Sequence, residues 1–166
     1  MMSESVFVKL LEHNNWANNQ IIQACHGLSN EQLDAEPQSA TMGSIRRTLI
    51  HLVAAQQGYL SLLTLPVEAR SRVQIQFSEL GESARRSGEG LLALVREMSD
   101  EYLEAQLHTT DGYLVEPWVV LVQVINHATE HREQIKNMLS ALGLTPPEID
   151  GWDYGFSTKA LIPRGT

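Results

Sequence analysis

Two histidines one helical turn apart are the residues of this sequence best suited to chemistry. His127 and His131 are four positions apart in a segment with helical apolar spacing, and residues i and i+4 lie on one face of an α-helix. The stripe that contains them is otherwise mostly apolar, so both imidazoles should point inward, where they must be neutral and partnered. Two roles fit such a pair: hydrogen bonding to neighbouring groups, or coordination of one metal ion.

A third histidine favours the metal. His51 lies in an earlier helical segment, on a stripe that also contains the small residues Ala55 and Gly58. Small side chains leave space beside the imidazole for a solvent molecule or a ligand. Three neutral imidazoles without an acidic fourth ligand describe a site with one open position, which is typical of catalytic rather than structural zinc. Nickel and iron also accept imidazole, so the ligand type does not select the metal.

A competing motif covers the same segment. Residues 127–131 fit H-x-x-E-H, the inverted zinc-protease signature, with Glu130 as general base. We reject this interpretation because the match has only three fixed positions and few residues follow it to supply a third ligand and a cleft. Glu130 is also flanked by Arg132 and Glu133, on a face that we expect to be solvated.

The other candidate residues give structural predictions. His13, His26 and His108 are interpreted as surface or capping residues, in a helix, at a helix end and in a loop respectively. Cys25 lies on an apolar stripe and is expected to be a small core residue. The sequence has no nucleophile elbow, no phosphate-binding glycine loop and no inward carboxylates for a di-iron site.

Composition limits the class of protein. The chain has 166 residues, of which 43% are hydrophobic, so it can form the core of one domain and is not disordered. The net charge of −8 repels phosphates and argues against a nucleic-acid partner. A single cysteine excludes an internal disulfide and fits a reducing compartment. With neither a signal-peptide pattern nor an apolar run near the ~20 residues that span a bilayer, we expect a cytoplasmic protein without a membrane partner.

The apolar spacing is helical almost throughout the chain. It predicts an all-α four-helix bundle in one domain over residues 1–166, with helices over about 7–25, 45–63, 77–98 and 117–142. Three glycines weaken the third helix, and Gly88-Glu89-Gly90 is interpreted as a loop or a weak helix end.

The segments between and after these helices are less regular. Two connections, 66–76 and 101–116, are long, and the turn signal Asp111-Gly112 predicts a small hairpin in the second. The tail 145–166 is rich in Pro, Gly and aromatic residues and is predicted to pack as irregular structure over one end of the bundle. Its last six residues, LIPRGT, resemble a protease-cleavage linker and carry no weight here.

Longer stretches of sequence resemble a known family. The first helical segment carries LLEHNNWANNQII, the second SIRRTLIHLVAAQ and the fourth VINHATEHREQIKNMLSALGLTPPEID. In order, spacing and flanking sequence these stretches resemble the DinB family of the DinB/YfiT-like superfamily, over positions 10 to about 154. The resemblance is far more specific than three histidines alone.

This resemblance implies a fold, a metal and an assembly. The fold is a four-helix bundle with a long crossover connection, often a homodimer, with a divalent metal, zinc or nickel, on His51, His127 and His131. Some superfamily members are thiol S-transferases that use bacillithiol or glutathione, others are mycothiol-dependent isomerases, and many have no established activity. Two departures near the expected pocket, Glu133 in place of a common glycine and Gln57-Gly58-Tyr59 in place of an aromatic run, prevent transfer of a substrate.

Two functions therefore stay open from the sequence. In the first, the protein is a metal-dependent transferase of stress or detoxification metabolism, in which the metal binds a low-molecular-weight thiol and lowers its pKa. In the second, it is a non-enzymatic, metal-stabilised stress protein that acts through a partner surface. The sequence names no general acid or base that would decide between them.

Overall fold

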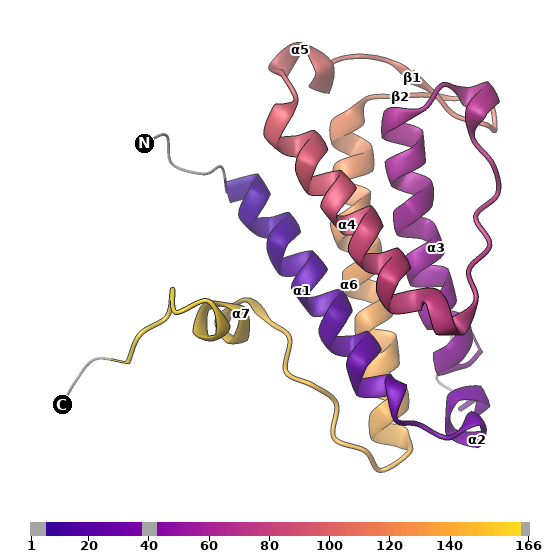
Figure 1. Ribbon diagram of the computed structural model, residues 1–166, viewed down its shortest axis with the longest axis vertical. Helices are drawn as coiled ribbons and strands as arrows, with labels where there is room; N and C mark the ends of the chain where they lie inside the picture. The colour runs from indigo at the N-terminus through magenta and orange to yellow at the C-terminus, as the bar shows by residue number, and fades with distance from the viewer. Residues whose placement is uncertain (1–5, 38–42, 164–166) are drawn as a thin grey trace.

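Four long helices form the body of the molecule. The computed structural model describes residues 6–37 and 43–163. The helices are α1 (Val6–His26), α3 (Ile45–Thr64), α4 (Leu80–Glu97) and α6 (Pro117–Ala141). Both α1 and α3 pack against α4 and α6, which confirms the predicted four-helix bundle (Figure 1).

A long connection determines the direction of the helices. Helices α3 and α4 run in the same direction because residues 65–79 return along the length of the bundle (Figure 1). This connection contains two short 3-10 helices, η1 (Val67–Ala69) and η2 (Phe77–Glu79). The long crossover implied by the family resemblance is therefore present.

Local sequence signals set the ends of several helices. The Ser29 hydroxyl accepts a hydrogen bond from the backbone N–H of Gln32, whose side chain bonds back to Ser29, and this capping box starts α2 (Asn30–Asp34). Ser44 caps α3 in the same way, through the backbone N–H of Arg47. Pro117 occupies the first turn of α6, where its missing N–H costs nothing.

The second long connection lies over one end of the bundle. It contains α5 (Asp100–Leu103) and two antiparallel strands, β1 (Leu107–His108) and β2 (Leu114–Val115). The turn between the strands includes Gly112 with a φ of 91°, a conformation that favours glycine. The predicted hairpin is confirmed.

The core is divided by a polar layer. One apolar cluster includes Ile21, Leu49 and Ile135, and a second includes Leu11 and Leu91. On α1, α3 and α4 the buried polar residues Asn14, Asn18, Gln56 and Ser87 lie between the two clusters in sequence, and Arg132 of α6 is buried against them. The bundle therefore contains two groups of apolar contacts separated by hydrogen-bonded groups.

Two predictions about local structure were wrong. Gly88 and Gly90 lie inside α4, where a Cβ on Gly88 would come within 2.7 Å of the Asn15 side chain. Glycine here permits close packing of α4 on α1 and does not end the helix. The tail contains a helix, α7 (Gly151–Ser157), because the Asp150 side chain accepts hydrogen bonds from the two backbone N–H groups that begin it.

The tail packs on α1 through aromatic rings. The Tyr154 ring lies 5.4 Å from that of Trp16 and 5.5 Å from that of His13, measured between centroids. The last three residues of LIPRGT lie outside the described residues. In the part of the chain that the structure describes, no helix is long and apolar enough to cross a membrane.

Candidate metal centre

The three histidines expected to share a metal meet between α3 and α6. Nε2 of His127 lies 3.0 Å from Nε2 of His51 and 3.1 Å from Nε2 of His131. One ring nitrogen from each histidine lies within 4.8 Å of the other two. The helical spacing of His127 and His131 and the packing of α3 against α6 thus bring three donors to one point, which could hold a metal ion.

Hydrogen bonding alone satisfies these nitrogens poorly. Nδ1 of His131 lies 2.8 Å from Oε1 of Gln134, which can only accept, so Nδ1 carries the proton and Nε2 presents a lone pair. A single proton on Nε2 of His127 would then have to serve both short contacts. A cation instead takes all three lone pairs. Two nitrogens on a tetrahedral zinc ion lie about 3.3 Å apart, close to the 3.0 and 3.1 Å that separate Nε2 of His127 from the other two.

The surroundings keep two of the imidazoles, those of His51 and His127, neutral, as ligation requires. Burial, together with the neighbouring His131, lowers the pKa of His51 below its ordinary value. Burial, reinforced by His131 and His51, lowers the pKa of His127 to about 4. At neutral pH both rings are therefore free of the proton that would compete with a metal.

Gln134 holds one imidazole in place. Its bond to Nδ1 of His131 fixes the tautomer and the ring orientation, the role that second partners of metal-bound histidines commonly have. Gln134 lies one turn beyond His131 on α6. It belongs to the stripe identified in the sequence, but its role was not predicted because glutamine has many uses on a helix.

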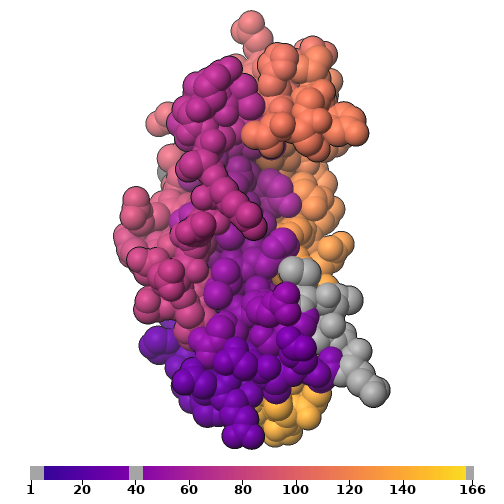
Figure 2. Space-filling model, turned by 90° about the vertical axis from the view of Figure 1, so that its right-hand side faces the viewer, coloured from indigo at the N-terminus to yellow at the C-terminus, as the bar shows by residue number. Residues whose placement is uncertain are grey.

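A cavity of about 420 Å³ opens beside His51 and His127. Figure 2 shows the side of the molecule on which α3 lies between the crossover connection and α6, below the hairpin. Ala55 and Gly58 of α3 line the cavity, as expected from their small size, together with residues of the crossover and the hairpin turn. The histidine cluster is therefore connected to a space that a small molecule can enter.

Tyr59 is a second polar group of this cavity that the sequence did not assign. Its ring lies edge-on to His127, with centroids 5.7 Å apart. Burial raises the pKa of Tyr59, so its hydroxyl is protonated at neutral pH and can donate a hydrogen bond. Of the two departures from the family pattern, Tyr59 lines the cavity, whereas Glu133 is exposed and lines a different hollow. The expectation that Glu133 lies near the pocket was wrong.

The remaining histidines lie away from the cluster. His26 is exposed at the end of α1, as predicted, and His108 is in β1 rather than a loop. His13 is not a surface or capping residue, because Nε2 contacts the backbone oxygen of Ile149 at 2.9 Å and its ring packs on the tail. Glu130 is exposed and is not one of the clustered ligand groups, which agrees with the rejection of the protease motif.

Arg132, beside the cluster in sequence, is buried and not on a solvated face. Only 3% of it is exposed, and its Nη1 donates to the side-chain oxygens of Asn14 at 2.8 Å and Asn18 at 2.6 Å. Asn18 in turn donates to Gln56, and burial lowers the pKa of Arg132 to about 10. The sequence prediction failed because two neighbouring glutamates suggested an exposed face.

Comparison with known proteins identifies the family. A sequence model of the DinB family matches residues 2–165. The chain belongs to the DinB family. It is 26% identical over 170 residues to Protein DinB of Bacillus subtilis (strain 168), a match that covers 95% of this chain and 98% of the relative.

A solved structure shows the same fold. The crystal structure of a DinB-like protein from Bacillus cereus ATCC 10987 superposes with a TM-score of 0.67 at 21% identity. The match covers 87% of this chain and 95% of that one. The DinB-like helical bundle is therefore confirmed, while the activity is not addressed by this likeness.

Proposed function

We propose that this DinB protein is a metal-dependent transferase that joins a thiol to a small electrophile. The observation that carries the proposal is the convergence of three imidazole nitrogens beside an open cavity, a ligand set that leaves a coordination position for a reactant. His51, His127 and His131 would hold a divalent ion, zinc or nickel. Such an ion, when bound, supplies a Lewis acid that lowers the pKa of a coordinated thiol.

The residues of the chain have separate tasks in this proposal. The low pKa values of His51 and His127 keep the donors unprotonated at neutral pH. Gln134 fixes the orientation of His131. Tyr59 lines the same cavity and its hydroxyl is protonated. In this proposal that hydroxyl donates a hydrogen bond to the leaving group of the electrophile.

A direct assay tests this function. Metal-loaded protein is incubated with a panel of low-molecular-weight thiols and 1-chloro-2,4-dinitrobenzene, in which a C–S bond forms, the C–Cl bond breaks, chloride leaves and the thiol proton goes to solvent. We expect turnover that is lost on chelation, restored by metal and lost in His127→Ala. The matched control His26→Ala, a change at an exposed histidine, should retain it. Turnover that is insensitive to chelation would overturn the proposal.

A second candidate function has one observation in its favour. Trp118, Val122, Tyr113 and Leu114 expose large apolar side chains near the start of α6 and on the hairpin. Exposed apolar groups of this kind are used for protein contacts. A protein that binds metal and turns over no thiol in the panel would support the non-enzymatic role, in which the metal stabilises a bundle that acts through such a surface.

A further inference from the structure

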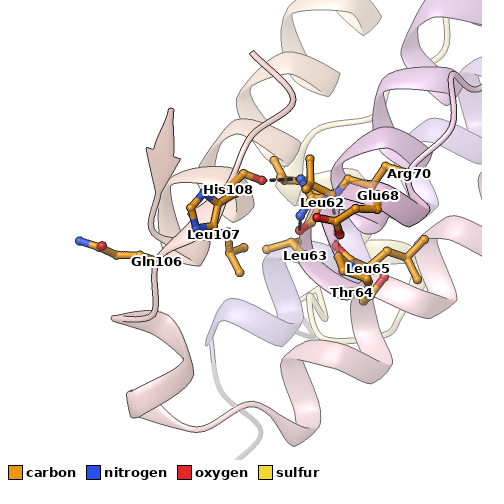
Figure 3. Close-up of a pocket in the computed structure, with 11 residues that line it drawn as sticks. Leu62, Leu63, Thr64, Leu65, Glu68, Arg70, Gln106, Leu107 and His108 are labelled. Carbon is orange, nitrogen blue, oxygen red and sulfur yellow. Dashed lines mark hydrogen bonds between the residues drawn. The ribbon is translucent and has the colours of Figure 1, made fainter. Parts of the chain in front are cut away.

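Arg70 occupies an unusual position in the crossover connection. Its Nε donates to the backbone oxygen of Leu65 at 2.9 Å, Nη1 to that of His108 at 2.5 Å and Nη2 to that of Leu62 at 3.2 Å. Figure 3 shows these bonds, which join the end of α3 to strand β1. The guanidinium is thereby fixed in space by neutral backbone groups from two elements.

The charge of Arg70 is not neutralised by these bonds. Backbone oxygens carry no full charge, and no carboxylate of the described residues forms an ion pair with Arg70. A guanidinium has five N–H donors, of which the three bonds use one on each nitrogen. One N–H on each terminal nitrogen is left, which matches the two oxygens of a carboxylate.

Arg70 also lines the cavity that opens on the histidines. The same cavity is lined by His51 and His127, by the hydroxyl residues Ser61 and Thr109, and by the apolar side chain of Leu62. Among the described residues that line it, Arg70 carries the one permanent positive charge and Asp111, on the hairpin turn, the one carboxylate. A ligand that reaches the histidines therefore lies in a cavity that Arg70 also lines, next to the hollow drawn in Figure 3.

We propose that Arg70 binds a carboxylate on the small molecule whose thiol reaches the metal. The inference rests on the proposed thiol chemistry and specifies its substrate class: a small thiol that also carries a carboxylate. A phosphate is disfavoured because its second negative charge would be repelled by Asp111 and by the net charge of −8 on the protein. Among the described residues that line the cavity, only Arg70 carries a permanent positive charge to offset it. The apolar part of the cavity fits the carbon chain between the two groups.

A pair of probes that differ in one charge tests the proposal. Cobalt-loaded protein is titrated with 3-mercaptopropionate and with its methyl ester, and the sulfur-to-cobalt charge-transfer absorption reports binding. At neutral pH the acid is ionised and the ester is not. We expect the acid to bind about tenfold tighter than the ester, the effect of one charge-assisted hydrogen-bond pair.

Three variants locate the source of this preference. In Arg70→Gln the acid and the ester should bind equally. In Arg72→Gln, which removes an equal charge from an exposed neighbour that does not line this cavity, the tenfold preference should remain. Arg70→Lys, which keeps the charge without the fixed fork, should show an intermediate ratio. If Arg70 served only to join α3 to β1, its loss would lower the melting temperature and weaken both probes alike.

Each result decides between the two levels of the proposal. The role of Arg70 is overturned if acid and ester bind the parent equally. It is also overturned if the preference persists in Arg70→Gln, because the carboxylate would then chelate the metal. Both outcomes leave the thiol chemistry intact. If neither thiol gives the absorption band, the thiol chemistry fails. The carboxylate site then survives only if propionate shifts the backbone resonances of residues 66–76 in metal-free parent protein and not in Arg70→Gln.

Discussion

Helix α6 contributes consecutive residues to two polar clusters that are satisfied in different ways. Arg132 faces α1, where the side-chain oxygens of Asn14 and Asn18 accept its hydrogen bonds. His131 faces α3, where its Nε2 lies 3.1 Å from that of His127, which in turn lies 3.0 Å from that of His51. The first cluster joins donors to acceptors, whereas the second gathers three ring nitrogens that could hold one metal ion.

This difference separates a structural use of buried polar groups from a functional one. The arginine cluster extends through Asn18 and Gln56 to Ser87 and so crosses all four long helices. Most of its groups find their partners within the protein, although Nδ2 of Asn14 is buried without a hydrogen-bond partner among the described residues. The cluster fixes how the helices pack against one another. The histidine cluster brings three ring nitrogens together beside a cavity, where they could hold a metal ion from outside the chain.

Loss of the arginine should have the largest effect on stability. Arg132→Met leaves the side-chain oxygens of Asn14 and Asn18 buried without a donor. Because hydrogen bonds to a charged group are worth about 1.5–3 kcal/mol each, we expect the free energy of unfolding to fall by about 3 kcal/mol in chemical denaturation. Arg85→Met, which removes exposed ion pairs with Glu82 and Glu89, should have little effect. Equal losses of stability in Arg132→Met and Arg85→Met would show that the buried arginine stabilises the fold no more than the exposed one.

Loss of a histidine should affect metal binding and not the fold. In His127→Ala two imidazoles are left, and we expect metal affinity to fall by more than about 100-fold. This loss exceeds the 10- to 100-fold loss typical when a residue that hydrogen-bonds a metal ligand is removed. The metal-free variant should melt close to the metal-free parent. Titration with zinc against a competing chelator measures the first effect and calorimetry the second. A variant that binds zinc like the parent would show that His127 is no ligand.

The resemblance to the DinB family and the helical periodicity together predicted most of this comparison. The four helices follow from apolar spacing, the hairpin from the Asp111-Gly112 turn signal, and the crossover from the family resemblance. The meeting of His51, His127 and His131 was expected from helical spacing together with that resemblance. The three histidines meet because α3 packs against α6. The sequence could indicate this packing only through the helix face on which each histidine lies.

The polar contacts between distant segments were not predictable in this way. Arg132 was expected to be solvated because charged residues lie next to it in sequence. The asparagines that bind it are more than a hundred positions away on α1, where local spacing gives no sign of them. Arg70 lies in a connection without periodicity, and its partner His108 belongs to the hairpin. Such contacts depend on the three-dimensional path of a crossover, which local spacing does not specify.

Removal of the group that orients His131 should have a smaller effect than removal of a ligand. Gln134→Leu keeps the volume of the side chain but leaves Nδ1 of His131 without its acceptor. We expect a 10- to 100-fold loss of zinc affinity with an unchanged stoichiometry of one ion per chain. Asn137→Leu, at an exposed position of the same helix, serves as the control. The second-partner role of Gln134 fails if both variants bind zinc equally well.

Acid should change the stability of the metal-free protein in one direction. The folded-state pKa of His127 is about 4 and its ordinary value is 6.5, so between these values the unfolded chain binds more protons than the folded one. The free energy of unfolding of the metal-free protein should therefore fall as pH is lowered through this window. In His127→Gln the slope against pH should be shallower, whereas in His26→Gln it should match the parent. A steeper slope in His127→Gln would contradict the sign of the shift.

The central claim, that the histidine cluster takes its partner from outside the chain, is tested most directly by metal-induced stabilisation. Melting temperatures are measured at pH 7.5 with and without zinc for the parent and for the triple variant His51→Gln, His127→Gln, His131→Gln, with elemental analysis of both. At a free ion concentration 100 times the dissociation constant we expect about 2.7 kcal/mol of stabilisation, roughly 5–10 °C, and one ion per chain in the parent. The triple variant should show neither. Equal stabilisation of the two proteins by zinc would contradict the account.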